Sequence, residues 1–332
     1  MPEPGSEWLI ERGIGETRAI LVADEEILAA RVAWDDELRA GTVLEARLAT
    51  RAPGGRHGSV HLPDGVIALV DGLDPTLTEG APLTVRVTRA AIAERGRTKL
   101  AQVRPAPGEV PHVPDLAETL RATGHRVSVL LPTDRSFDRA GWHDLVEQAS
   151  SGEVPFPGGS LTISPTPAMT LIDIDGPPPV TALALGAVPA VAAALARLDI
   201  AGSIGIDFPT LPTKADRQSV DAALEAELAG WKGERTSVNG FGFVQLVSRL
   251  EGPSLVARFA RRPAAAAARV LLRQAEHVAE PGVLLLTLHP AVRRAIRPEW
   301  EAELARRTGR ALRWHEDATL ALHAGFAQAV PA

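Results

Sequence analysis

The sequence predicts an α/β protein with an inserted β-barrel and a small C-terminal α/β domain. Residues 41–104 contain about five short strand-like runs, separated by glycine and proline clusters such as "APGGRHG" and "EGAP". This spacing is typical of a small barrel, for which the OB-fold is a natural candidate. A proline-rich linker follows at 105–115, and strand and helix patterns alternate from there to about residue 260. Residues 263–332 alternate differently, which indicates a further small domain.

Length and composition set the outer limits. The chain has 332 residues, of which 45% are apolar and 23% charged, which indicates a globular protein with two or more domains. It has no cysteine, which excludes disulfides, thiolate zinc sites and cysteine nucleophiles. The net charge of −6 argues mildly against a general nucleic-acid binder. The start lacks a signal-peptide layout, and we find no apolar run long enough for a bilayer. The sequence therefore predicts a cytoplasmic protein without a membrane partner.

The expected elements follow in order along the chain. Residues 7–34 read as two short strands, "EWLIERG" and "TRAILVADEEILAARVAW", with a turn at "ADEE", and the barrel strands come next. Beyond the linker, the patterns predict a helix near 115–123, a strand at 126–132, a helix at 139–152, a hairpin at 158–175, a helix at 180–198, a strand at 202–208, a helix at 214–230 and a hairpin or bulged strand at 235–250. The terminal region should contain a helix at 264–279, a strand at 282–290, a helix at 298–309, a strand at 311–317 and a helix at 320–329.

Two aspartates close apolar, β-rich runs that have a helix between them. Asp173 ends "TLID" and Asp207 ends "SIGID", and 34 residues separate them. That is about the length of one βαβ unit, whose two strands are parallel. A right-handed crossover would place both carboxylates at the carboxyl edge, where open α/β sheets bind their ligands. Asp175 points to the same face as Asp173, because side chains alternate along a strand.

Carboxylates this close repel each other unless one is protonated or a cation lies between them. Oxygen-only ligands favour Mg²⁺ or Mn²⁺ over zinc, with Asp173 and Asp207 as ligands and Asp175 as a third, direct or through water. Such a site suits metal-assisted phosphodiester hydrolysis. The alternative is that Asp173 and Asp175 only begin a turn, because Asp before Gly-Pro is a common turn signal.

The basic segment 86–104 is a second candidate feature. It carries five arginines and one lysine against one acid, Glu94. On a small barrel these cations would form a positive rim for a phosphate backbone. The alternative is a solvated hairpin tip, which is the commoner role of an isolated run of charge. The cations are Arg86, Arg89, Arg95, Arg97, Lys99 and Arg104.

Five segments in order resemble the catalytic core of the ribonuclease E/G family of bacterial endoribonucleases: "FPGGSLTI", "AMTLIDID", "AGSIGIDFPT", "RQSVDAALEAEL" and "SVNGFGFVQLVSRLEGPSL". The opening "EWLIERGIGETRAILVADEEI" is similar to the family's first strands. The resemblance implies an RNase H-like part at 1–36 and 105–156, an OB-fold RNA-binding domain at 37–104, a DNase I-like catalytic part at 157–260 and a small C-terminal α/β domain at 261–332.

The same resemblance implies roles for individual residues. Asp173 and Asp207 match the family's catalytic carboxylates that hold Mg²⁺. Asp175 takes the place of the family's Asn beside the scissile phosphate, which exchanges a donor and acceptor for an anion that only accepts. The basic loop of the barrel and a later arginine are expected to contact RNA through Arg89, Arg95, Arg97, Lys99 and Arg249.

Three departures from the family's pattern modify these expectations. The family's Cys-Pro-x-Cys zinc link is absent, so we expect no zinc, and any homo-oligomer would form without a zinc link. The stretch between the barrel and residue 125 is too short for the family's 5′-end sensor, so we expect no preference for 5′-monophosphate RNA. The family's polar loops are replaced by "GPPPVTA" after Asp175 and by "FPTL" after Asp207, so the rim of the site has lost polar groups.

The sequence therefore predicts a metal-dependent endoribonuclease that hydrolyses phosphodiester bonds of single-stranded RNA in RNA processing or decay. The altered rim and the acidic net charge leave a second hypothesis open, a non-catalytic RNA-binding protein that keeps the fold. A structural or ribosome-associated scaffold is a third.

Overall fold

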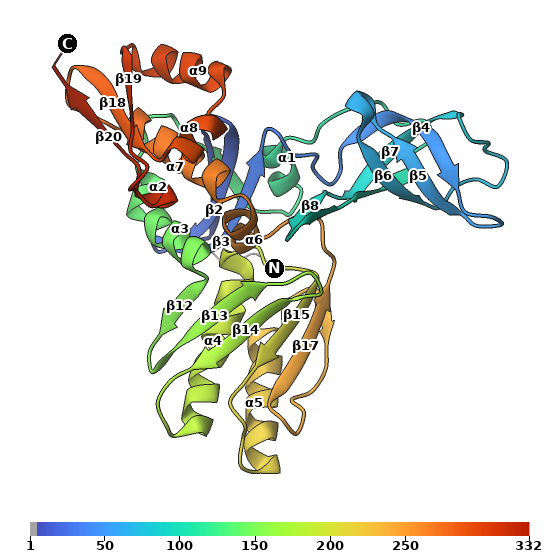
Figure 1. Ribbon diagram of the computed structural model, residues 1–332. Coiled ribbons are helices and arrows are strands. Elements are labelled where there is room, and N and C mark those ends of the chain that lie inside the picture. Colours follow the sequence, from blue (N-terminus) through green and yellow to red (C-terminus); the bar gives the residue numbers. More distant parts are fainter. Residues whose placement is uncertain (1–4, 332) are drawn as a thin grey trace.

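The barrel expected between residues 41 and 104 is present. The computed structural model describes residues 5–331, and five strands close a barrel in the order β10-β6-β5-β4-β7. Alternate residues of these strands are buried and form one apolar core, which is what closure of a sheet on itself requires. The barrel is OB-like in strand number and projects to one side of the molecule (Figure 1). Its elements are β4 (Val43–Arg51), β5 (His57–His61), η1 (Pro63–Gly65), β6 (Ile67–Asp71), β7 (Pro82–Arg89) and β10 (Ala101–Pro105).

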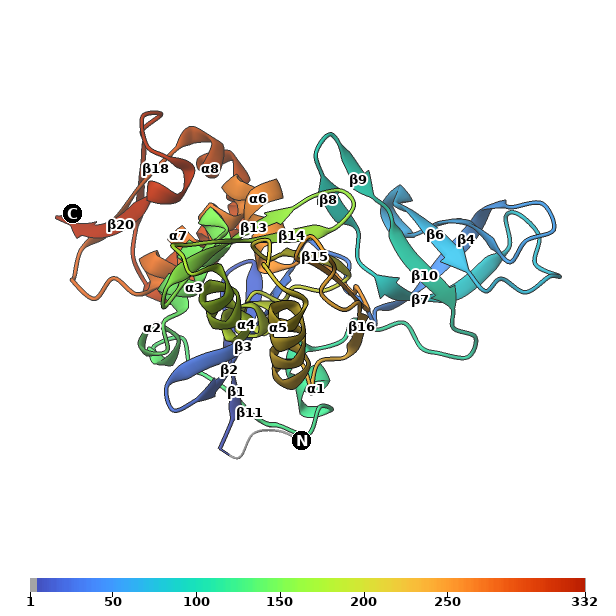
Figure 2. The same ribbon diagram turned by 90° about the horizontal axis from the view of Figure 1, so that it is seen from below.

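A short hairpin extends the barrel between its last two strands. It consists of β8 (Ile92–Glu94) and β9 (Arg97–Lys99), which pair only with each other. Most of the basic segment 86–104 belongs to this hairpin and to the ends of β7 and β10. The hairpin lies between the barrel and the largest sheet (Figure 2), and β8 packs against a helix that follows that sheet, α6 (Leu255–Arg261).

The N-terminal segment forms three strands where the sequence analysis predicted two. They are β1 (Glu7–Arg12), β2 (Glu16–Ala23) and β3 (Glu26–Trp34), and they join β11 (Arg126–Val129) in the order β11-β1-β2-β3. The second predicted strand is divided into β2 and β3 at the predicted turn "ADEE", where Asp24 and Glu25 have φ +48° and +65°. In the turn before β2, Gly15 has φ +76° and lies against the ring of Trp300. A Cβ on Gly15 would come within 2.5 Å of that ring, so glycine is required by both backbone and space.

The largest sheet has six strands in the order β12-β13-β14-β15-β17-β16. Helices α4 and α5 cover one of its faces (Figure 1). Thr213 begins α5 with a capping box, in which its side chain and that of Asp216 each accept a backbone N–H at the helix start. The strands are β12 (Glu153–Phe156), β13 (Gly159–Pro165), β14 (Thr170–Asp175), β15 (Ser203–Asp207), β16 (Gly233–Arg235) and β17 (Phe243–Ser248), and the helices are α4 (Val180–Arg197) and α5 (Lys214–Glu227).

Helix α4 corrects one expectation. Within residues 5–331 it is the one helix whose length and composition would suit a membrane span, with a mean hydropathy of 1.7, whereas the sequence analysis found no such run. The helix packs against the sheet, against α5 and against β3 of the N-terminal sheet. Leu183, Ala187, Val191 and Leu195 of its inner face are buried. These contacts make α4 a core helix of the fold.

Three short helices near the sheets complete this part of the chain. They are α1 (Leu116–Arg121), α2 (Ser136–Arg139) and α3 (Trp142–Ser151). The carboxylate of Asp115 caps α1 by accepting the backbone N–H of Ala117 at 2.6 Å. Helix α3 ends at Gly152, which has φ +77° and lies against the carbonyl of Ile163, where a side chain would not fit.

The C-terminal region contains a three-stranded sheet in the order β19-β18-β20. The prediction of a helix at 320–329 is wrong: this segment forms a short 3₁₀ turn and then β20, antiparallel to β18. An apolar run of this length is ambiguous between helix and strand, and the buried strand β18 needs a partner on this side. The elements are α7 (Pro263–Glu276), β18 (Val283–Leu288), α8 (Pro290–Ala295), α9 (Pro298–Thr308), β19 (Leu312–Glu316), η2 (Leu322–Ala324) and β20 (Phe326–Val330).

A buried ion network joins the N-terminal sheet to α6 and α7. Glu11 on β1 is 1% exposed and pairs with both Arg18 of β2 and Arg273 of α7. The guanidinium of Arg18 lies 4.9 Å from the centre of the Trp142 ring, which covers it from α3. A buried charge is tolerated only when it is paired and hydrogen-bonded, so this network holds the three chain segments in one arrangement.

Arg269 is a second node of the network. Only 2% of the residue is exposed. Its guanidinium donates to the carbonyl of Gly15 at 3.0 Å and to the carboxylate of Asp36 at 2.8 Å. It also lies between the rings of Trp34 and Trp300, 4.1 and 4.6 Å from their centres. The polar and aromatic partners together leave little room for another side chain.

We predict that Arg269→Ala destabilises the protein by about 2–5 kcal/mol, because it removes a buried guanidinium that bonds to Asp36 and Gly15 and leaves a cavity between the rings of Trp34 and Trp300. Urea denaturation followed by circular dichroism measures this free energy of unfolding. Arg306→Ala is the matched control, because Arg306 pairs with Glu303 on the surface of α9; it should change stability little. Equal effects of the two variants would contradict the structural role of the network.

Histidine 277, which follows α7, gives the network a pH dependence. Burial, together with the neighbouring charges of Arg273 and Arg135, lowers the pKa of His277 to about 4 against the opposing effect of Asp138. The unfolded chain has the ordinary value of about 6.5, so it binds the proton more tightly than the folded chain does. The contribution of unprotonated His277 to the free energy of unfolding is therefore complete above about pH 6.5 and is lost as the pH falls towards 4.

We predict that the free energy of unfolding falls less steeply between pH 6.5 and pH 4 in His277→Gln than in the wild type. Denaturant titrations at several pH values in this window, on both proteins, measure the two slopes. Parallel slopes would show that His277 takes up its proton equally well in the folded and unfolded chains.

Candidate functional site

Asp173 and Asp207 lie directly opposite each other in the sheet. Strands β14 and β15 are parallel neighbours, and their register pairs Asp173 with Asp207. Helix α4 makes the connection between the two strands. The βαβ arrangement proposed from the spacing of these residues is therefore present, and both carboxylates lie at the carboxyl ends of their strands.

The two carboxylates lie on the face of the sheet that α4 and α5 leave uncovered. Along β14 the residues alternate between exposed and buried, and Asp173 and Asp175 are exposed while Ile172 and Ile174 are buried. Asp207 is likewise exposed beside the buried Ile206. The apolar set faces the helices, so the hydrophobic core fixes the carboxylates on the outer face.

The electrostatics of the group are those of crowded anions. Partial burial raises the pKa of Asp173 above its ordinary value, and the negative charges of Asp175 and Asp207 raise it further. A backbone N–H, that of Ile174 at 3.1 Å from Oδ1, acts in the opposite direction. A divalent cation between the carboxylates would relieve this repulsion.

A tight loop beside the carboxylates connects β16 to β17. The side-chain oxygen of Asn239 accepts the backbone N–H groups of Phe241 at 2.8 Å and Phe243 at 3.1 Å. Gly242 has φ +93°, and a Cβ on it would come within 2.4 Å of the carbonyl oxygen of Phe208. The loop is therefore held against the residue that follows Asp207, with glycine required at its closest approach.

An apolar floor lies next to the paired carboxylates. Phe243 is the register partner of Asp207 on β17. Its ring extends over Gly205, where a Cβ would be only 2.5 Å from the ring, and the side chain of Leu171 borders the same point at 3.0 Å. Gly205 thus provides the space that the Phe243 ring occupies on the outer face of the sheet.

The donor set fits Mg²⁺ or Mn²⁺ in one respect and is incomplete in another. Two adjacent, exposed carboxylates with raised proton affinity at one of them are oxygen ligands of the kind that Mg²⁺ takes, together with water and substrate phosphate. Within residues 5–331, however, no three His, Cys, Asp or Glu side chains are grouped so that they could hold a metal by themselves. Water or substrate would have to supply the remaining ligands.

The predicted RNA-binding residues of the barrel lie at the other end of the sheet. Lys99 and Ile92 of the hairpin line a small pocket together with Thr170 and Ser203, which begin β14 and β15. The carboxylates are at the opposite ends of the same two strands. The structure therefore does not bring the basic hairpin next to Asp173 and Asp207.

The individual cations differ in their surroundings. Arg89 is only 8% exposed and donates to the carbonyl of Leu100 at 2.6 Å, across the base of the hairpin. Arg97 pairs with Glu94 at 2.6 Å, and Arg249 pairs with Glu251 at 3.3 Å on the surface. Arg95 is exposed at the turn of the hairpin, next to Gly96. RNA contacts at these residues and at Lys99 stay a prediction.

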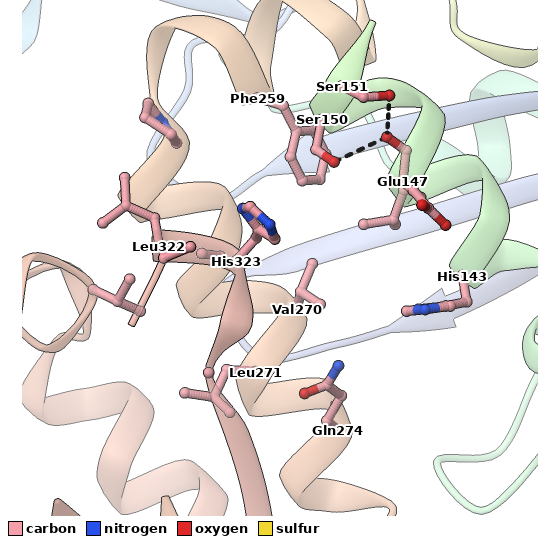
Figure 3. Close-up of a pocket in the computed structure, with 16 residues that line it drawn as sticks. His143, Glu147, Ser150, Ser151, Phe259, Val270, Leu271, Gln274, Leu322 and His323 are labelled. Atoms are coloured by element: carbon pink, nitrogen blue, oxygen red, sulfur yellow. Dashed lines mark hydrogen bonds between the residues drawn. The ribbon is translucent and has the colours of Figure 1, made fainter. Parts of the chain in front are cut away.

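A pocket with apolar walls lies away from the carboxylates. It has a volume of about 660 Å³ and opens between α3, α7 and the segment before β20 (Figure 3). Phe259, Val270 and Leu271 form apolar walls, and the hydroxyls of Ser150 and Ser151 are turned to the Glu147 carbonyl, each at 2.9 Å. None of the residues that line it belongs to β14, β15 or β17. It therefore makes no contribution to the carboxylate site.

Comparison with known proteins gives a family match that covers this sheet. Residues 108–248 match the model of the Ribonuclease E/G family. These residues, which include β12 to β17 and both aspartates, therefore form a Ribonuclease E/G family domain. A search of the curated proteins found no match.

The sequence analysis overlooked the aromatic side of the site. Phe241 and Phe243 lie in "NGFGF", which entered the predictions as part of a hairpin or bulged strand and of the family resemblance, with no role for either ring. One signal was present: aromatic residues make up only 4% of the chain, so two in three positions beside a predicted carboxylate strand are unusual. The placement of the Phe243 ring over Gly205 could not be read without the register of β15 and β17.

We predict that both Asp175→Asn and Asp207→Asn lower the pKa of Asp173 in the metal-free protein, because each removes a negative charge that raises it. Carboxyl-carbon NMR titration in the presence of EDTA measures this pKa. Asp144→Asn, a change at an exposed carboxylate of α3, is the control and should leave the titration of Asp173 where it is. An ordinary pKa for Asp173 in the wild type would contradict the crowding of the three anions.

Proposed function

We propose that this protein is a metal-dependent endoribonuclease that hydrolyses phosphodiester bonds of single-stranded RNA. The observation that carries the proposal is the register that pairs Asp173 with Asp207 at the carboxyl ends of two parallel strands, inside a Ribonuclease E/G family domain. Open α/β sheets bind their ligands at this edge. The family description supports action on RNA, and the pair of carboxylates supports the metal.

In this proposal, Asp173 and Asp207 hold Mg²⁺ or Mn²⁺, which when bound polarises the scissile phosphate and makes a water molecule more acidic. The two aspartates also keep the ion on the open face of the sheet, where a strand of RNA has access. Asp175, two residues further along the same face, accepts a hydrogen bond from water at the edge of the site. No zinc link of the Cys-Pro-x-Cys kind forms, since the chain has no cysteine.

The barrel and its basic hairpin serve as the RNA-binding part. Arg95, Arg97 and Lys99 would contact phosphates without reading bases, which predicts binding that weakens as salt rises. Arg249 lies on the segment that follows β17 and would add a further contact. Arg89 acts at the base of the hairpin, where its bond to Leu100 holds the cations in position.

The finer organisation follows the family resemblance. Residues 1–36 and 105–156 correspond to an RNase H-like part, 37–104 to an OB-fold RNA-binding domain, 157–260 to a DNase I-like catalytic part and 261–332 to a small terminal domain. Any homo-oligomer forms without a zinc link, the enzyme acts in the cytoplasm, and it does not prefer 5′-monophosphate ends.

One observation favours a second candidate function, that of an RNA-binding protein without catalysis. The basic hairpin lies at the amino ends of β14 and β15, so RNA bound there does not by itself reach the carboxylates. The loop after Asp175 is also apolar, "GPPP", and offers no cation to an RNA strand. This candidate predicts salt-sensitive RNA binding that is indifferent to substitution of Asp207.

We predict that the full-length protein cuts a single-stranded, AU-rich RNA in Mg²⁺ and that Asp173→Asn and Asp207→Asn each reduce the rate by more than about a hundredfold, since each removes a metal ligand. Gel analysis of a 5′-labelled RNA over time measures the rate. Asp144→Asn is the matched control and should cut like the wild type.

Two results would reject the assignment. Cutting that survives in both aspartate variants would come from another site or a contaminant. Wild-type protein that binds the RNA and cuts it in neither Mg²⁺ nor Mn²⁺ would support the non-catalytic candidate. Parallel assays with 5′-monophosphate and 5′-hydroxyl RNA test the expected indifference to the 5′ end.

A further inference from the structure

Phe241 has a highly exposed aromatic ring and belongs to the loop beside the carboxylates. It is 82% exposed, and in the part of the chain that the structure describes no other large apolar side chain is more exposed. Full exposure of an aromatic ring forfeits the free energy that burial would contribute. An isolated exposed apolar residue needs no explanation by itself, so the surroundings of Phe241 decide what the ring can do.

The loop that carries Phe241 is fixed in place. The Asn239 side chain accepts the backbone N–H of Phe241, and the carbonyl of Asn239 accepts the N–H of Gly242 at 3.1 Å. On the other side, the N–H of Phe208 donates to the carbonyl of Gly242 at 3.2 Å. The backbone at Phe241 is therefore anchored to the residue after Asp207. A ring displayed from such a loop loses little conformational freedom when it binds a partner.

The loop borders a surface that has both apolar and ionic parts. Phe243, two residues on, lies on the outer face of the sheet over Gly205 and is the register partner of Asp207. Asp207 in turn pairs with Asp173. A ligand at this point would meet flat aromatic surface and, one strand away, a pair of carboxylates suited to a cation. A nucleotide fits both parts of this surface, because it has an aromatic base and a phosphate.

We propose that Phe241 is a base-stacking residue, on which one unpaired nucleobase of single-stranded RNA lies while the neighbouring phosphate is at the carboxylates. This inference rests on the proposed function, and it adds a positioning role that the carboxylates do not supply. Stacking on an aromatic side chain requires an unstacked base and tolerates any base, so it selects single strands over duplexes without reading sequence. Phe243 and Leu171 form the floor beside it.

The test is a binding measurement on the full chain with a 12-nucleotide RNA, in Ca²⁺ to suppress cutting. In one series a single abasic nucleotide is moved along the RNA, so that each base is removed in turn. For the wild type, removal of one particular base should weaken binding by about tenfold, the magnitude of one aromatic stacking contact. Phe241→Ala should weaken binding of the intact RNA by the same factor and lose its sensitivity at that position. Phe241→Trp should keep both.

Phe326→Ala is the matched control, because Phe326 is also exposed, at 44%, but lies on β20 of the C-terminal sheet. It should bind the whole series like the wild type. Phe241→Ala that keeps wild-type affinity and the same position dependence overturns the inference. So does a change of oligomeric state in Phe241→Ala, measured by light scattering, with RNA binding unaltered, since the ring would then bind a second copy of the chain.

These experiments distinguish failure of the stacking role from failure of the proposed endoribonuclease function. If the wild type cuts RNA and Phe241→Ala shows unchanged binding, the endoribonuclease assignment stands and the stacking role falls. If the wild type binds the series with the predicted position dependence and never cuts, stacking stands on its own and catalysis falls.

Discussion

The buried ion network between the N-terminal sheet and α7 is the constraint on which the arrangement of the molecule depends. Glu11 sits between Arg18 and Arg273, which come from distant parts of the chain, and Arg269 links Gly15, Asp36 and two tryptophan rings. Charges held out of water are stable in only one set of partners. The network therefore specifies how the first and last thirds of the chain meet, whereas the apolar contacts around it would tolerate several packings.

The carboxylate site is built by a different device, the register of a parallel strand pair. Burial of Ile172, Ile174 and Ile206 against the helices fixes the phase of both strands, since a slip by one residue would turn each aspartate into the core. The anions thus end up side by side because of the apolar residues between them. Burial of these apolar residues offsets the mutual repulsion of the carboxylates, which contributes to the raised pKa of Asp173. Because the carboxylates repel each other when no cation is bound, a cation that binds between them relieves this repulsion and is bound more favourably.

The features that depend on local periodicity could be predicted from the sequence. Those that depend on pairing with a distant segment of the chain could not. The barrel, the helices α4 and α5 and the pairing of Asp173 with Asp207 followed from alternation, turn residues and the length of one crossover. The segment at 320–329 was misread because its pairing with β18 lies about 40 residues away, and no local signal distinguishes that strand from a helix. Phe241 escaped notice for a similar reason: its significance comes from a neighbouring strand, and its exposure is invisible in the letters "NGFGF".

Strand β14, which is six residues long, lies between the basic hairpin and the carboxylate pair. Its first residue, Thr170, lies by the basic hairpin, and its last, Asp175, lies beyond Asp173 at the carboxylate end. At about 3.3 Å per residue, the distance along the strand from Thr170 to Asp173 is roughly 10 Å. Any single polymer chain that touches Lys99 and the carboxylate pair at the same time has to cross at least this span. In the proposed function, this separation favours long, flexible RNA strands over short fragments whatever their sequence.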